Sequence, residues 1–143
     1  MKTRTVLCAL LALAALDAPV LAQTHDSTPP ALTAFTFTPS NPNATAGPAT
    51  VTFSITATDD LSGVASVRIG LACAATGVQV SGSIAPSPST SLTTTVPVIF
   101  PRYSAAGTWS VVSVILVDAA GNQRTLFAAD LTGAGFSTAI TVQ

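Results

Sequence analysis

This chain of 143 residues is 48% hydrophobic and only 8% charged, and beyond residue 22 it has three arginines, five aspartates, no lysine and no glutamate. Its length corresponds to a single domain. With no basic patch, the composition argues against nucleic-acid binding and against attachment to a membrane through basic side chains.

Residues 1–22 have the organisation of an export signal. Two basic residues precede an apolar stretch over residues 6–16, which is too short to span a bilayer. Val20 and Ala22 satisfy the cleavage rule before Gln23. A retained N-terminal anchor is the alternative interpretation. We expect a secreted protein, periplasmic or extracellular, whose mature chain begins at Gln23 and spans no membrane.

The rest of the chain has the pattern of short β-strands. After an extended lead-in at residues 23–30, apolar and β-branched residues alternate with polar ones between loops rich in Pro, Gly and Ser. This pattern predicts about seven or eight strands and no long helix. The predicted strands cover residues 31–38, 49–58, 64–71, 78–84, 92–100, 109–117, 123–127 and 137–142, with one helical turn at 128–131.

Two of these strands have a predictable place in a sheet. Pro97 cannot donate a ladder hydrogen bond, so strand 92–100 is expected to lie at a sheet edge or to bulge there. Strand 109–117 is apolar at successive positions, which predicts a central strand covered on both faces. We therefore predict an all-β fold for residues 31–143, an antiparallel Ig-like β-sandwich of Greek-key type. Tyr103 is expected to form a tyrosine corner or, alternatively, to be an ordinary half-buried side chain.

Two β-rich stretches end in the same turn pattern, Asp-x-x-Gly. It occurs at Asp60–Gly63 and again at Asp118–Gly121. In a type I turn the carboxylate at the first position accepts nearby backbone N–H groups, and glycine suits the fourth position. Both aspartates are therefore expected to cap turns between antiparallel strands.

Removal of the export signal would leave Cys73 as the only cysteine, so no internal disulfide could form. Its neighbours are apolar, and free cysteine packs like a small hydrophobic residue. We expect a buried, poorly reactive thiol. A disulfide with another chain is the alternative.

Five short motifs follow one another along the mature chain. They are Asp26-x-x-Pro29-Pro30-x-Leu32, Phe35-x-Phe37-x-Pro39, Ala57-Thr58-Asp59-Asp60-Leu61-Ser62-Gly63-Val64, Pro101-x-Tyr103-x-x-x-Gly107-x-Trp109 and Asp118-Ala119-Ala120-Gly121-Asn122. In this order they resemble bacterial immunoglobulin-like (Ig/fibronectin-III-like) repeats of secreted and surface proteins. The resemblance implies a sandwich module that serves as a spacer, an adhesive or an accessory domain.

The reactive side chains argue against an enzyme. The only histidine, His25, lies in the lead-in, where it cannot be held beside a nucleophile. The expected function is a secreted, non-catalytic module for protein or cell-surface interaction, or for structural support in the bacterial envelope. Its protein or surface partner is not identified by the sequence, and no cofactor other than calcium is expected.

Calcium is the one metal that the sequence suggests. In an antiparallel sandwich, the start of the first strand and the two aspartate-containing turns share an end, which gathers Asp26, Asp59, Asp60 and Asp118 together with Asn122. Carboxylates on neighbouring loops are ligands that Ca²⁺ uses. The alternative is that each aspartate only caps its own turn.

Calcium binding would suit a second function, a calcium-dependent adhesive or carbohydrate-binding accessory domain. Sugar binding usually needs exposed aromatic side chains, and Trp109 and Tyr103 are the candidates beyond phenylalanine. Both are expected to be structural instead.

Overall fold

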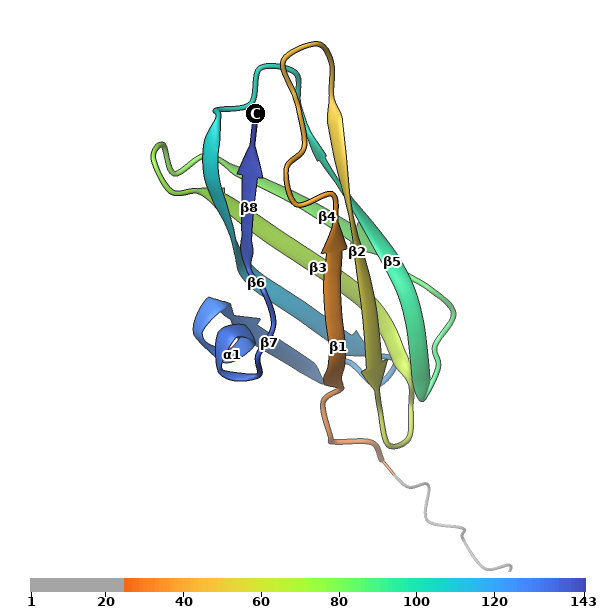
Figure 1. Cartoon of the computed structure of the whole chain (residues 1–143). Coiled ribbons are helices and arrows are strands. Elements are labelled where there is room, and N and C mark those ends of the chain that lie inside the picture. The colour runs from red at the N-terminus through yellow and green to blue at the C-terminus, as the bar shows by residue number, and fades with distance from the viewer. Residues whose placement is uncertain (1–24) are drawn as a thin grey trace, which may run out of the picture.

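Two antiparallel sheets packed face to face make up residues 25–143, the part of the chain described by the computed structural model (Figure 1). The predicted export signal, residues 1–22, lies outside the described residues. The expected all-β sandwich is confirmed. Its elements are β1 (Ala31–Thr38), β2 (Ala49–Thr58), β3 (Val64–Cys73), β4 (Gln79–Ile84), β5 (Ser91–Phe100), β6 (Gly107–Asp118), β7 (Gln123–Phe127), α1 (Ala128–Gly133) and β8 (Ala139–Val142).

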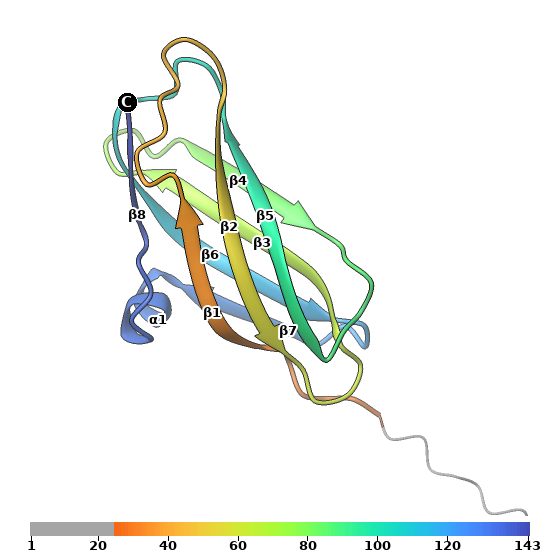
Figure 2. The ribbon, with the colours of Figure 1, turned by 45° about the vertical axis from the view of Figure 1, so that its right-hand side comes forward.

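The strands divide unequally between the sheets. The smaller sheet has the order β1-β2-β5, and the larger has the order β4-β3-β6-β7 with β8 also paired to β6. Along one side of β6, β7 pairs with residues 113–117 and β8 pairs with residues 107–110. The other side of β6 pairs with β3. β7 and β8 are thus successive pieces of one edge, separated by a segment that contains α1 (Figure 2). The expected Greek-key type stays a prediction.

The smaller sheet follows the sequence pattern closely. Val51, Phe53 and Ile55 of β2 are buried, and the Thr and Ser residues between them are at least partly exposed. β5 pairs only with β2, so Pro97 lies on an edge strand as predicted. Regular pairing along the whole of β2 and β5 leaves the alternation undisturbed.

β6 is central, as predicted, but only one of its faces is fully buried, which corrects the expectation of cover on both faces. In the pairing with β3, the register skips Val112. This β-bulge reverses the alternation, so that Val111 and Val114 both point into the core. Ile115 and Val117 lie on the outer face and stay partly exposed. The apolar run therefore reflects a bulge at Val112 together with apolar residues, Ile115 and Val117, on a partly exposed outer face.

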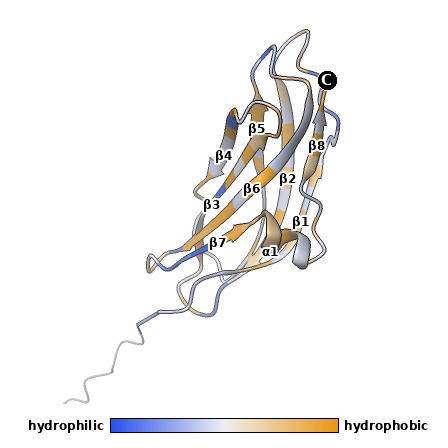
Figure 3. Cartoon of the chain, turned by 90° about the vertical axis from the view of Figure 1, so that its left-hand side faces the viewer, coloured by the Kyte–Doolittle hydropathy of each residue, from blue (hydrophilic) through white to orange (hydrophobic). Residues whose placement is uncertain are grey.

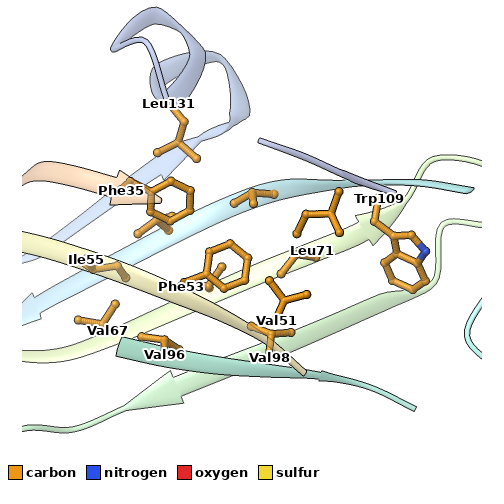
Figure 4. Close-up of a cluster of buried hydrophobic side chains, with 14 of the residues drawn as sticks. Phe35, Val51, Phe53, Ile55, Val67, Leu71, Val96, Val98, Trp109 and Leu131 are labelled. Atoms are coloured by element: carbon orange, nitrogen blue, oxygen red, sulfur yellow. The ribbon is translucent and has the colours of Figure 1, made fainter. Parts of the chain in front are cut away.

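The core lies between the sheets and joins side chains from both of them (Figure 4). Phe53 of β2 and Trp109 of β6 are fully buried. The rings of Phe100 and Trp109 meet edge to face with centroids 5.1 Å apart, and the indole N–H donates to the Ala105 carbonyl at 2.9 Å. Burying a side chain such as Phe or Leu contributes about 1.5–3 kcal/mol. Leu131 carries α1 into the same core.

Cys73 lies at the end of β3 and is buried, 2% exposed and free, which confirms the expected burial. The Thr76 hydroxyl lowers the pKa of the thiol, while desolvation by burial acts in the opposite direction. Because the thiol is screened from solvent, burial limits the access of reagents to it.

Tyr103 is neither a tyrosine corner nor half-buried, which corrects both expectations. Its side chain is 72% exposed and its φ is 65°, in the left-handed region. The Tyr103 N–H donates to the Ala44 carbonyl at 2.9 Å, which fixes the backbone there. The ring lies 4.4 Å from the Arg102 guanidinium carbon instead of packing inside. Local spacing to Trp109 could not reveal this left-handed turn.

The two lateral sides of the sandwich differ. On one side β4 and β5 are so close that a Cβ atom added at Gly82 would overlap the Pro97 carbonyl oxygen. On the other side β1 and β8 are edge strands of different sheets. Glycine at position 82 therefore allows β4 and β5 to approach closely on one lateral side, whereas on the other side no backbone hydrogen bond joins residues 33–37 to residues 135–139 in the described chain.

We predict that Gly82→Ala destabilises the protein by about 1–3 kcal/mol, because the β5 backbone must move away. Urea unfolding monitored by circular dichroism measures the change. Gly47→Ala is the matched control, since its added Cβ would have no heavy atom within 4 Å and no left-handed φ to strain it. Equal unfolding midpoints for the two variants would contradict the tight contact.

Candidate metal centre at the acidic pole

One end of the sandwich gathers four of the five described aspartates. We define the acidic pole as Asp26, the β2–β3 turn (residues 59–63) and the β6–β7 turn (residues 118–122). Figure 3 shows hydrophilic residues in the loops at this end of the sandwich. This is the shared end that antiparallel connections predicted.

Hydrogen bonds between segments distant in sequence hold the acidic pole together. The Ala119 N–H donates to the Gly63 carbonyl at 2.9 Å, which joins the two turns. The side-chain amide of Asn122 donates to the backbone carbonyl of Asp26 at 3.2 Å. The lead-in is therefore attached to the β6–β7 turn at Asp26, although its composition predicted only an extended segment.

Asp26 is a buried carboxylate, 6% exposed, and both of its oxygens are engaged. Oδ1 accepts the Thr28 N–H at 3.0 Å and Oδ2 accepts the Ser62 N–H at 2.8 Å. The Ser62 hydroxyl, followed by the Thr28 N–H, lowers the pKa of Asp26, whereas desolvation raises it. Hydrogen bonding to the charged form outweighs the cost of burial.

Asp59, and not Asp60, caps the first turn, which corrects the expected cap. Oδ2 of Asp59 accepts the Leu61 N–H at 3.3 Å and the Gly63 N–H at 2.6 Å. β2 ends at Thr58, so Asp59 is the first residue of the turn and its side chain is free to fold over it. The Asp-x-x-Gly pattern had placed the cap one residue too late.

Asp118 caps the second turn as predicted. Its Oδ1 accepts the Asn122 N–H at 2.8 Å and its Oδ2 accepts the Asn122 side-chain amide at 2.8 Å. The Gly121 N–H donates to the Asp118 carbonyl at 3.3 Å. Gly121 has a φ of 93°, a left-handed conformation that glycine adopts easily because it has no Cβ atom. Both oxygens of Asp118 are engaged within their own turn.

The structure brings together three of the four predicted metal ligands. Asp26, Asp59 and Asp60 each offer an oxygen, and these oxygens lie within 4.8 Å of one another. Asp118 does not join this group. Asp60 is exposed, so the group is accessible from solvent. Oδ1 of Asp59 is buried without a hydrogen-bond partner. A buried carboxylate oxygen of this kind normally has a donor or a cation beside it.

The aromatic candidates for sugar binding separate in the structure. Trp109 is fully buried and presents no face to a ligand. Tyr103 is exposed, contrary to the expectation that it is structural, but its ring is stacked with Arg102. His25 is exposed in the lead-in.

Comparisons with protein-family models, with curated proteins and with solved structures found no match. The resemblance to immunoglobulin-like repeats therefore stays a prediction. Within residues 25–143, no helix has the length and apolar character needed to cross a membrane.

The lowered pKa of Asp26 predicts a pH-dependent stability. The unfolded chain takes up a proton at higher pH than the folded chain, so the stabilisation is present near neutral pH and is lost as the pH falls below the ordinary aspartate value of 3.8 and through the lower folded pKa. Urea midpoints should separate the wild type from Asp26→Asn at pH 7 and converge at low pH. A difference that is the same at both ends of this range would contradict the prediction.

Proposed function

We propose that this chain is a secreted, non-catalytic, Ig-like module that works through protein or cell-surface interaction or through structural support in the bacterial envelope. The observation that supports the proposal best is the way in which the strands are distributed between the two sheets. In the Ig arrangement the first, second and fifth strands share one sheet, and the third, sixth and seventh share the other. β1, β2 and β5 lie together here, as do β3, β6 and β7, while β4 joins β3.

Two further observations support a binding role over catalysis. The aspartates at the acidic pole are held by turn hydrogen bonds, as Asp118 and Asp59 illustrate. The single histidine, His25, lies exposed in the lead-in, before the first strand. A rigid sandwich with structural acids suits a module whose surfaces bind.

We expect the full chain, expressed in a bacterium, to leave the cytoplasm with residues 1–22 removed. Intact mass spectrometry of the exported protein should give the mass of a chain that begins at Gln23. The immobilised mature protein should then retain an envelope component reproducibly, and the urea-unfolded protein should not. A mass that includes residues 1–22 would contradict export with cleavage. Equal retention by folded and unfolded protein would contradict a specific module.

The acidic pole favours a second candidate function, calcium-dependent adhesion. The specific observation is the buried, unpartnered Oδ1 of Asp59 within the group formed with Asp26 and Asp60. These residues would hold Ca²⁺ through carboxylate oxygens, the ligands that this ion prefers. The bound cation would offset repulsion among three adjacent carboxylates and would stiffen the β2–β3 turn.

For this candidate, we predict that Ca²⁺ at about 100 times its Kd adds about 2.7 kcal/mol to the free energy of unfolding and raises Tm by roughly several degrees. Mg²⁺ should do less, because it demands tighter octahedral geometry. Asp60→Asn should remove the shift without unfolding the protein, since Asp60 is exposed. Asp130→Asn, on α1, is the matched control and should keep the shift. A Tm that is the same in millimolar Ca²⁺ and in chelator would contradict calcium binding and leave the aspartates with a role in the turns only.

A further inference from the structure

A groove opens on the lateral side of the sandwich where β1 and β8 belong to different sheets. It has a volume of about 580 Å³. Residues 33–37 of β1 and Ser40 form one wall, and residues 135–137 and Ala139 form the other. We call it the β1–β8 groove. Its size lies in the range of sites that hold a small ligand or a short peptide segment.

The interruption between β7 and β8 creates this groove. At its upper end the loop after β1 pairs with β8, since the Thr141 N–H donates to the Ser40 carbonyl and the Gln143 N–H to the Pro42 carbonyl, each at 2.9 Å. Lower down, the segment between α1 and β8 meets β1 through the rings of Phe35 and Phe136, whose centroids are 6.1 Å apart. No backbone hydrogen bond joins residues 33–37 to residues 135–139 in the described chain.

β1 presents an unpaired backbone edge to the groove. It pairs with β2 on one side only, and the backbone groups of a strand alternate between its two sides. A row of N–H and C=O groups therefore faces the open side. Proteins usually protect such an edge with charge, proline or cover. The sequence of β1, ALTAFTFT, contains no charge and no proline.

The groove floor is aromatic and already rigid. The rings of Phe35 and Phe136 have centroids 6.1 Å apart, and those of Phe37 and Phe53 have centroids 5.4 Å apart. The Phe136 N–H donates to the Leu131 carbonyl at 2.9 Å, and Leu131 is anchored in the core. Phe37 and Phe136 are only partly buried, so an apolar side chain from a ligand can cover them.

The lining contains only threonine, alanine, phenylalanine, serine and glycine. A charged ligand would lose hydration there without gaining a counter-charge. The matching ligand has backbone donors and acceptors in extended register and uncharged side chains, apolar at alternate positions. β2, which pairs with the other side of β1, has this composition over Thr50–Ala57.

We propose that the β1–β8 groove binds an extended, uncharged peptide segment of a partner, which adds to β1 as an antiparallel or parallel strand and covers Phe37 and Phe136. This proposal rests on the proposed function, because it assigns the binding surface of the interaction module. A small apolar molecule would leave the β1 backbone groups unpaired. The groove also lies between two walls and accommodates a segment more readily than a second sandwich.

The first test uses a blocked synthetic peptide with the sequence Thr-Val-Thr-Phe-Ser-Ile-Thr-Ala, added to the folded, isotopically labelled mature protein. NMR titration should show saturable shifts of the backbone amides of residues 33–37 and of Phe136. The control peptide has the same side chains but alternate N-methylated amides. It should bind at least about tenfold more weakly, because it cannot complete a ladder. Equal binding of the two peptides would overturn strand addition, because it would show that apolar side chains bind the groove without backbone hydrogen bonds.

The second test changes the protein. Ala139 is exposed on the groove wall, so Ala139→Lys places a long charged side chain there without removing packing. It should weaken peptide binding at least about tenfold, since covering the charged side chain with an uncharged peptide would cost it hydration without a counter-charge. Thr95→Lys is the matched control and should bind normally, because Thr95 is exposed on β5, at the edge of the smaller sheet opposite β1. Tm values equal to that of the wild type establish that both variants are folded.

Three results would overturn the proposal. The first is the absence of shifts in residues 33–37, and the second is unchanged affinity in Ala139→Lys. The third is a dimer of the free protein in sedimentation that Ala139→Lys dissociates, which would identify a second copy as the occupant. Failure here is distinguishable from failure of the proposed function. An exported chain that still retains its envelope component after Ala139→Lys keeps the module function and loses only this groove.

Discussion

The apolar faces of the two sheets hold each other in place, and no disulfide assists them within residues 25–143. Side chains such as Phe53 and Trp109 are removed from water only while both sheets are present. Since each sheet alone would expose one apolar face, neither is expected to persist without the other. This mutual dependence requires that the strands keep their register, because a one-residue slip would turn the apolar side chains outward. The bulge at Val112 shows how one extra residue is absorbed without losing the core.

The sandwich leaves two kinds of surface for interaction, and they differ in chemistry. At the acidic pole the chain turns, so backbone N–H groups lack ladder partners and carboxylates such as Asp59 accept them. Along the β1–β8 groove the strand continues but its neighbour is missing, so unpaired backbone groups lie beside aromatic rings. The pole presents carboxylates, and the lowered pKa of Asp26 links its stability to pH, whereas the lining of the groove is uncharged. Partners at the two surfaces would not compete.

Local sequence patterns predicted the features that depend on local geometry. β2 was predictable because its alternation has one buried and one solvent-facing side, and Pro97 marked an edge because it lacks an N–H group. Patterns failed where distant segments decide the outcome. Nothing near Asp26 indicates that Ser62 will meet it, and nothing near Phe136 indicates that its segment will leave β1 uncovered. The acidic pole was therefore anticipated in outline from topology, while its hydrogen bonds and the groove were not.

Trp109 is the single tryptophan of the chain, and its position has a practical consequence. Its indole is fully buried, with one hydrogen bond to the Ala105 carbonyl and the ring of Phe100 edge to face with it. Fluorescence from one such site has a single origin, so its emission should shift to longer wavelength when water reaches the ring. Trp109 lies on β6, the strand to which both β3 and β8 are paired. Because Phe100 belongs to β5 of the other sheet, the native protein carries an internal optical probe at a contact between the two sheets.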